Sequence, residues 1–119
     1  MPNMEAAGIE PAQGSPGTRK EWGPGTREGY VYFLREWGND ESPIKIGFSG
    51  DITERVRQLR YTTGLDLELL AWFPATLSVE RDLHKRFAAS RVRGEWFKPT
   101  KELLDAIGLV RVLHNEAAA

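Results

Sequence analysis

The 119-residue chain contains no cysteine. Disulfide bonds, thiolate zinc sites and a cysteine nucleophile are therefore excluded. No stretch approaches the roughly 18 consecutive apolar residues that a membrane-spanning helix requires. The N-terminus lacks a basic segment followed by an apolar one, so no signal peptide is predicted. Together these absences predict a cytoplasmic protein with no membrane partner.

A strong net charge is also missing. The 16 lysine and arginine residues nearly balance the 17 aspartate and glutamate residues, for a net charge of -1. Global charge therefore gives no indication of nucleic-acid binding, and such a function must depend on local clusters.

Residues 1–28 have few large apolar side chains besides Trp22 and are rich in proline and glycine. Such a segment cannot bury enough surface to offset the entropy of ordering it, so a disordered N-terminal arm is predicted. One folded domain is predicted over residues 29–109, with residues 110–119 as a C-terminal tail.

Two runs with the alternation of β-strands dominate this domain, at residues 30–34 and 44–48. Gly38-Asn39-Asp40 between them favours a hairpin. If the more apolar face of each strand points to the core, Tyr32 and Lys45 emerge together on the opposite face, beside Gly47. A phenol and an amine next to a glycine suit a bound phosphate and a water.

Helix signals follow the hairpin. Asp51 is a good N-cap for a helix that ends near Gly64. A third strand is predicted over residues 67–73, ended by Pro74, and a second helix over residues 77–89. Residues 91–97 are predicted as a loop with a short extended piece, and residues 101–107 as a third helix ended by Gly108. The predicted order is β-β-α-β-α-α, an α+β fold.

The second helix places Glu80 and His84 one turn apart on one face. The segment from residue 81 to residue 93 carries five basic side chains and one acidic one. Such a cluster could follow a phosphate backbone, and a solvated helix face explains it equally well.

Five motifs in order carry a resemblance to a known family: Tyr30-Val31-Tyr32, Lys45-Ile46-Gly47, Arg55, the Glu80–His84 segment and Gly94-Glu95-Trp96-Phe97. With these motifs the chain resembles the GIY-YIG nuclease superfamily. It is most similar to the branch typified by a phage T5 open reading frame and by meiotically up-regulated fungal proteins. The resemblance covers residues 29–107.

The resemblance implies a small three-stranded antiparallel sheet flanked by helices. It also implies hydrolysis of DNA phosphodiester bonds with one divalent metal ion, Mg²⁺ or Mn²⁺. Carried over position by position, Tyr32 stands at the first-motif tyrosine, Arg55 at the arginine and Glu80 at the metal-binding glutamate. Lys45 replaces the second-motif tyrosine, and Tyr30 replaces the first-motif glycine. The lysine alters the usual division of labour between two tyrosines.

These residue types suit the implied chemistry. Glu80 offers a hard oxygen ligand, and Arg55 can donate two parallel hydrogen bonds to a phosphate. Either Tyr32 or Lys45 could take the proton from water, and Tyr32 is preferred. His84, with an ordinary pKa of about 6.5, could shuttle a proton or orient the metal site.

Supporting and binding roles are predicted for further residues. Gly47, Glu95 and Trp96 are expected to support the site. Contacts to DNA, mainly to its backbone, are predicted for Tyr30, Arg57, Arg81, Lys85, Arg91 and Arg93. Specificity would then come from a partner protein or a homodimer.

Two other functions stay open at this stage. One is a DNA-binding module of the same fold that does not cut, and the other is a protein-interaction domain. Each site residue also has an ordinary structural role open to it, such as a half-buried aromatic at Tyr32 or an edge-strand charge at Lys45.

Overall fold

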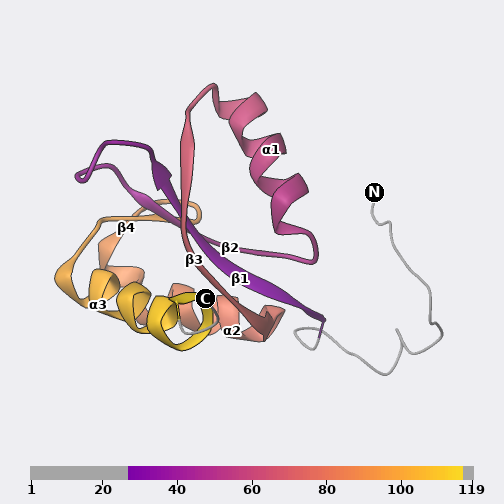
Figure 1. The fold of residues 1–119 in the computed structure, drawn as a ribbon. Coiled ribbons are helices and arrows are strands. Elements are labelled where there is room, and N and C mark those ends of the chain that lie inside the picture. Colours follow the sequence, from indigo (N-terminus) through magenta and orange to yellow (C-terminus); the bar gives the residue numbers. More distant parts are fainter. Residues whose placement is uncertain (1–26, 117–119) are drawn as a thin grey trace.

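The computed structural model describes residues 27–116, so the predicted N-terminal arm lies almost wholly outside the described residues. The elements in chain order are β1 (Glu28–Glu36), β2 (Ile44–Ser49), α1 (Ile52–Thr63), β3 (Leu67–Thr76), α2 (Leu77–Arg86), a 3₁₀ turn (Ala88–Ser90), β4 (Arg91–Arg93), β5 (Trp96–Phe97), α3 (Lys101–Val110) and a π-helical segment (Arg111–Glu116). Helix α1 covers one face of the sheet, and helices α2 and α3 cover the other (Figure 1). None of the helices in this part of the chain is long and apolar enough to cross a membrane.

The prediction of a small three-stranded sheet is wrong. The sheet has five antiparallel strands in the order β3-β1-β2-β5-β4. The two additional strands come from residues 91–97, and Gly94, with a φ of 50°, turns the chain between them. Strand β5 pairs with Ile44 and Lys45 of β2, which supplies partners to backbone groups at that edge. The broader α+β class stands.

The hairpin of β1 and β2 has the faces that the alternation predicts. Tyr32 lies opposite Gly47, and Phe33 lies opposite Ile46. One face joins the main core under α2 and α3, whose members include Val31, Phe33, Ile44, Ile46, Phe87, Leu103 and Ile107. The other face is buried as well, because Tyr32 and Leu34 pack with Val56 of α1 and Leu67 of β3. Tyr32 is therefore an interior residue.

Three helix ends, two of α1 and one of α3, follow their capping residues. The Asp51 carboxylate accepts a hydrogen bond from the Glu54 backbone N–H at 3.0 Å and begins α1. Gly64 ends α1 with a φ of 72°. The Thr100 hydroxyl accepts from the Leu103 N–H at 3.2 Å and begins α3.

Three expected ends are wrong. Helix α2 ends at Arg86 and not at residue 89, because the chain tightens into the 3₁₀ turn at Ala88–Ser90. Strand β3 continues through Pro74 to Thr76, which is tolerated because β3 lies at the edge of the sheet. The C-terminal helix continues past Gly108, first to Val110 and then through the π-helical segment. The side chain of Asn115 there accepts a hydrogen bond from the Trp72 N–H at 3.1 Å and donates to the Trp72 carbonyl at 3.0 Å. These contacts with β3 hold the segment in place where local propensity would end it.

Candidate active site

Tyr32 and Gly47 fit together across the β1–β2 pair. A Cβ atom built at Gly47 would lie 2.3 Å from the Cζ atom and 2.4 Å from the hydroxyl oxygen of Tyr32. Tyr32 is 0% exposed, and its hydroxyl has no hydrogen-bond partner among residues 27–116. The missing side chain of Gly47 therefore makes the space that the phenol occupies.

Charged groups surround the Tyr32 hydroxyl. Burial, the largest effect, raises the pKa of Tyr32, and the nearby Arg55 guanidinium opposes it. The carboxylates of Glu95 and Glu80 add to the increase in this pKa. The phenol is thus within electrostatic reach of three of the residues singled out by the sequence.

Arg55 reaches the site from the first turns of α1. Its Nη1 atom lies 3.5 Å from the carbonyl oxygen of Phe48 on β2, which directs the guanidinium back toward the sheet. Arg55 is half-buried, so its charge is only partly screened by water.

Lys45 projects from β2 on the same face as Tyr32. The Lys45 residue is 9% exposed, and its Nζ atom forms an ion pair with Glu95 Oε1 at 2.6 Å. The ammonium also lies 5.7 Å from the centre of the Trp96 ring. Glu95 follows Gly94 in the turn between β4 and β5, so the additional hairpin delivers this carboxylate to Lys45.

Glu80 and His84 come from α2, as the one-turn spacing predicts. Val79 and Leu83 of the same helix pack on the main core, which fixes the rotation of α2. Glu80 is 7% exposed; burial first, and Glu95 second, raise the pKa of its carboxyl, while His84 and Lys45 lower it.

His84 contacts the backbone of β2. Its Nε2 atom lies 2.8 Å from the carbonyl oxygen of Ile46. Because a carbonyl oxygen can only accept, Nε2 must carry the proton and donate. With Nε2 donating to Ile46, Nδ1 is the ring nitrogen that an unprotonated imidazole would offer to a metal.

Three potential metal ligands meet at this point. One ligand atom each from Glu80, His84 and Glu95 lie within 4.8 Å of one another. Two carboxylates and one imidazole form a donor set that divalent cations accept. The residues present therefore fit a single divalent ion, with the buried Tyr32 hydroxyl as an unsatisfied polar atom close by.

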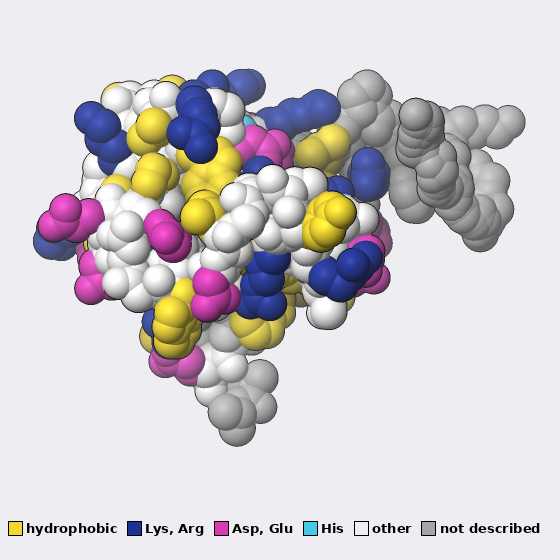
Figure 2. Space-filling model, turned by 90° about the horizontal axis from the view of Figure 1, so that it is seen from above, with side chains coloured by type: hydrophobic (Ala, Val, Ile, Leu, Met, Phe, Trp, Pro, Cys, Tyr) yellow, Lys and Arg dark blue, Asp and Glu magenta, His cyan; other side chains and the backbone are white. Residues whose placement is uncertain are grey.

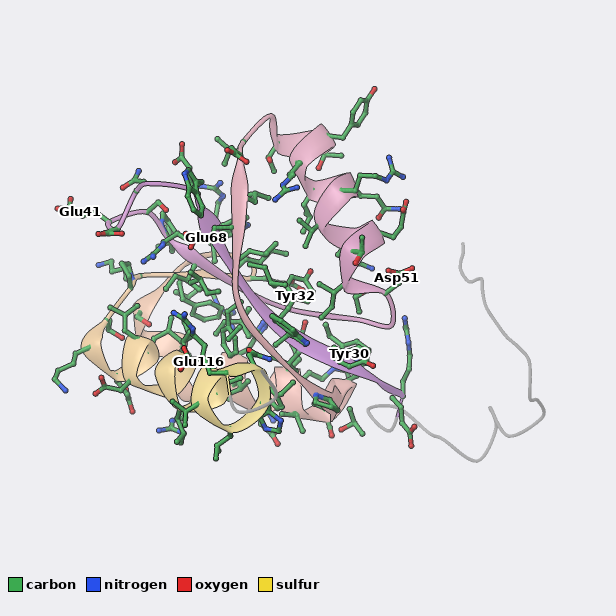
Figure 3. All side chains as sticks on the ribbon, in the orientation of Figure 1. Tyr30, Tyr32, Glu41, Asp51, Glu68 and Glu116 are labelled. Atoms are coloured by element: carbon green, nitrogen blue, oxygen red, sulfur yellow. The ribbon has the colours of Figure 1, made fainter. Side chains whose placement is uncertain are left out.

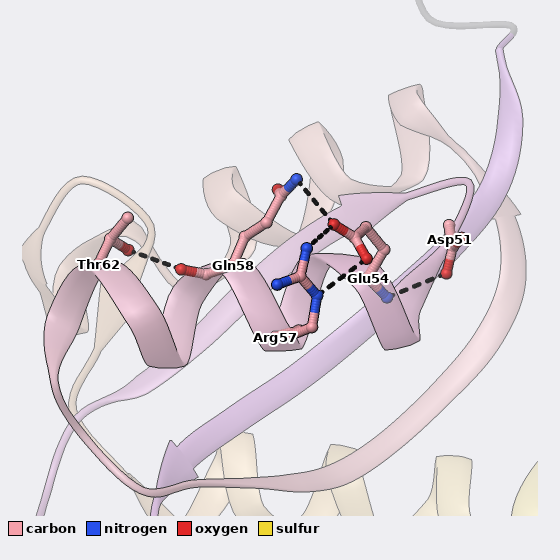
Figure 4. A network of polar contacts seen from close by, with 5 residues as sticks. All are labelled: Asp51, Glu54, Arg57, Gln58 and Thr62. Carbon is pink, nitrogen blue, oxygen red and sulfur yellow. Dashed lines mark hydrogen bonds and ion pairs between the residues drawn. The ribbon is translucent and has the colours of Figure 1, made fainter.

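The remaining predicted site residues lie around this cluster or apart from it. Tyr30 is 38% exposed and lies near Tyr32 on β1, close to the start of α1 marked by Asp51 (Figure 3). Arg57 is exposed on α1, where its Nε atom donates to Glu54 Oε1 at 3.1 Å and a second guanidinium nitrogen bonds to Oε2 (Figure 4). This pairing lowers the pKa of Glu54 and raises that of Arg57. Arg57 is thus engaged on its own helix.

Four basic residues extend from the cluster along α2 and β4: Arg81, Lys85, Arg91 and Arg93. All four are exposed. Arg91 Nη2 lies 3.4 Å from the carbonyl oxygen of His84, and its guanidinium lies over the Phe97 ring. In Figure 2 a histidine surface borders acidic side chains, with lysine and arginine side chains around them.

The role of Glu95 beside the metal donors is the feature that the sequence underestimates. The sequence marks Glu95 only as a supporting residue, because its motif position does not reveal that residues 91–97 form a hairpin. The contact of His84 with the Ile46 backbone leaves no trace in the sequence either. A Gly-Glu pair before two aromatic residues was the one available sign of a tight turn.

Fold and site together define an α+β domain with a partly buried cluster of acidic, basic and phenolic groups beside β2. The T5orf172 domain family matches residues 29–111, and the chain belongs to this family. The family is associated with nuclease-related domains of the GIY-YIG and HNH-like kinds. No curated protein and no solved structure gives a significant match to the chain.

Proposed function

We propose that the protein is a metal-dependent endonuclease of the GIY-YIG type that hydrolyses phosphodiester bonds in DNA. The observation that supports this most is the meeting of three potential metal ligands with a phenol and two cations at one place. Glu80, His84 and Glu95 lie within 4.8 Å of one another. The Lys45 ammonium forms an ion pair with Glu95. The positive charge of Arg55 lowers the pKa of Tyr32 against the larger effect of burial.

In this proposal Glu80, His84 and Glu95 hold one Mg²⁺ or Mn²⁺ ion. The bound ion would supply charge neutralisation at the phosphate and a lower pKa for a nearby water. His84 keeps Nδ1 free for this purpose because Nε2 donates to Ile46. The glutamates add the negative charge that a divalent cation needs.

Tyr32, as the phenolate formed once its hydroxyl proton has passed to solvent, is the proposed acceptor of the proton from the attacking water. Its hydroxyl is one of two buried side-chain polar atoms without a hydrogen-bond partner among residues 27–116, and the other is Arg35 Nε. Lys45 suits this step less well, because its ammonium is engaged with Glu95 at 2.6 Å and an ammonium has no lone pair to accept a proton. The charge of Arg55 favours the phenolate and so opposes the effect of burial.

Arg55 and Lys45 are proposed to bind the phosphate. The guanidinium offers paired donors, and the ammonium offers a point charge. The exposed basic residues of α2 and β4 would continue this positive surface along the DNA backbone. Contacts of this kind predict weak sequence preference, with a homodimer or a partner protein supplying any further specificity.

The test is nicking of supercoiled plasmid in Mg²⁺ or Mn²⁺, with DNA binding measured in the same samples. Wild-type protein is compared with Glu80→Ala and with Glu41→Ala, which removes an exposed glutamate in the β1–β2 loop. We expect Glu80→Ala to abolish nicking and retain binding, and Glu41→Ala to behave as wild type. Binding without cutting by wild-type protein would favour the non-cleaving DNA-binding module, and neither activity would favour a protein-interaction domain.

A further inference from the structure

The candidate site contains a buried cation of its own. Lys45, Ser49 and Glu80 are the buried polar or charged residues in the described part of the chain. The Lys45 ammonium is paired with Glu95 at 2.6 Å, which partly compensates the desolvation of the ammonium. The ammonium of Lys45 is thus already bound to Glu95, one of the three side chains that could bind a metal.

One negative charge in the cluster has no direct partner among residues 27–116. Lys45 bonds to Glu95 and His84 bonds to Ile46, and the Glu80 carboxylate forms no hydrogen bond or ion pair with either of them. A buried carboxylate is unfavourable unless it is paired or coordinates a metal. Lys45 is therefore the one cation in an ion pair with either carboxylate among residues 27–116, while His84 and Arg81 act on Glu80 from further away.

A second, independent feature points to a ligand at the same place. The Tyr32 hydroxyl is fully buried and meets no partner at hydrogen-bond geometry among residues 27–116, although Arg55 lies close enough to lower its pKa by hydrogen bonding. It is also within electrostatic reach of both Glu80 and Glu95. A polar atom in this situation is satisfied when a ligand or its bound water arrives.

We infer that Lys45 is the resident counter-ion of the metal-free site, and that a divalent cation replaces it at Glu95 and so frees the ammonium for the phosphate of the substrate. This inference rests on the proposed function and adds an order of binding to it: the metal ion binds before the DNA. Repulsion between the ammonium and a divalent ion would drive the exchange, because both would otherwise share one carboxylate. The Trp96 ring lies 5.7 Å from Nζ while Lys45 is paired with Glu95, and this cation–π contact can be kept when the ammonium leaves the carboxylate.

The first test measures Mn²⁺ binding without DNA, by the loss of the free-ion EPR signal. Wild-type protein is compared with Lys45→Met, which keeps the length of the side chain and removes its charge. Lys98→Met, which removes a charge from an exposed residue, serves as the control. We expect Lys45→Met to bind Mn²⁺ about tenfold more tightly than wild type, and Lys98→Met to be unchanged. Equal or weaker binding by Lys45→Met, in protein shown to be folded by circular dichroism, would overturn the inference.

The second test observes the ammonium directly. In ¹⁵N-labelled protein, the Lys45 Nζ resonance is assigned by its loss in Lys45→Met. A paired, buried ammonium should give a slowly exchanging signal that fades or shifts on titration with Mg²⁺, whereas exposed lysines should not respond. A Lys45 signal that is unchanged at saturating Mg²⁺ would contradict the exchange.

These measurements separate the two proposals because neither uses DNA cleavage. Tighter binding by Lys45→Met supports the exchange even if the wild-type protein never cuts DNA, in which case only the proposed function fails. Nicking that depends on metal, together with a Lys45 signal that metal does not change, would overturn only the exchange.

Discussion

At the scale of single residues, the Tyr32 hydroxyl is buried without a partner among residues 27–116. A buried polar atom without a hydrogen bond lowers the free energy of unfolding by about 1–3 kcal/mol, because it has lost its bonds to water. We therefore predict that Tyr32→Phe leaves the free energy of unfolding unchanged or raises it by about 1 kcal/mol. Nicking should fall at least about 100-fold, because the proposed proton acceptor is lost.

Urea unfolding and plasmid nicking on the same preparation check this prediction. Tyr61→Phe is the matched control, since Tyr61 is 88% exposed at the end of α1 and should change neither quantity. A Tyr32→Phe variant that is less stable and still cuts would mean that the tyrosine serves the fold.

Glu80 gives a prediction about pH. Burial raises its pKa above the ordinary value of 4.5, so the ionised carboxylate opposes folding at neutral pH. The stability that the protonated Glu80 carboxyl contributes is fully present below the pKa of Glu80 in the unfolded chain. It is lost as the pH rises through the higher pKa of Glu80 in the folded protein. Glu80→Gln, which stays neutral, should therefore be more stable than wild type at pH 7, and this difference should shrink toward pH 4.5. Urea unfolding across this range measures the difference, and a stability loss at pH 7 would contradict the account.

The identities of most site residues could be predicted from the sequence, and their environments could not. The spacing of Glu80 and His84 is a property of one helix, so it survives from sequence to structure. The ion pair of Lys45 with Glu95 joins residues that are 50 positions apart. It depends on a hairpin whose strands are too short to leave a periodic pattern.

At the scale of elements, Gly47 controls how β1 and β2 fit. Gly47→Ala should lower the free energy of unfolding by about 1–3 kcal/mol, because the new methyl group would meet the Tyr32 ring, which is held between two covered faces. Gly50→Ala is the control, since a Cβ atom there meets nothing within 4 Å. Thermal unfolding of both variants decides the matter. Equal changes in the free energy of unfolding for Gly47→Ala and Gly50→Ala would show that the close contact with Tyr32 does not affect stability.

Elements with strong local signals were predictable, and those held by distant contacts were not. Helix α1 begins at the cap of Asp51 and ends at Gly64 as expected, because both signals act within one turn. Strands β4 and β5 are held by pairing with the backbone groups of β2 and with each other. No local sequence pattern reveals this long-range pairing. The helix beyond Gly108 likewise depends on the contact of Asn115 with Trp72.

At the scale of the whole molecule, a net charge of -1 means that DNA affinity must come from a local surface. We predict that Lys85→Ala and Arg93→Ala each weaken DNA binding and lower the slope of log affinity against log salt by about 1. Both side chains are exposed and lie on the elements that border the site. Arg111→Ala, which removes an exposed charge paired with Glu116, should leave the slope unchanged. Fluorescence anisotropy over a salt series gives these slopes, and equal slopes for all three variants would exclude α2 and β4 as the DNA surface.

The α+β class was accessible from sequence because strand and helix periodicities differ. The five-stranded size of the sheet was not, since its last two strands comprise only three and two residues. The family match covers residues 29–111, and the C-terminal helical segment continues beyond it to Glu116.

The most direct measurement of the central claim is the metal dependence of nicking. Wild-type protein is freed of metal by dialysis against EDTA, assayed on supercoiled plasmid, and assayed again after Mg²⁺ or Mn²⁺ is added back in excess. The account predicts no nicking in EDTA, recovery with either ion, and no recovery in Glu80→Gln at any metal concentration. Nicking that persists in EDTA, or that Glu80→Gln retains, would contradict the metal-dependent mechanism.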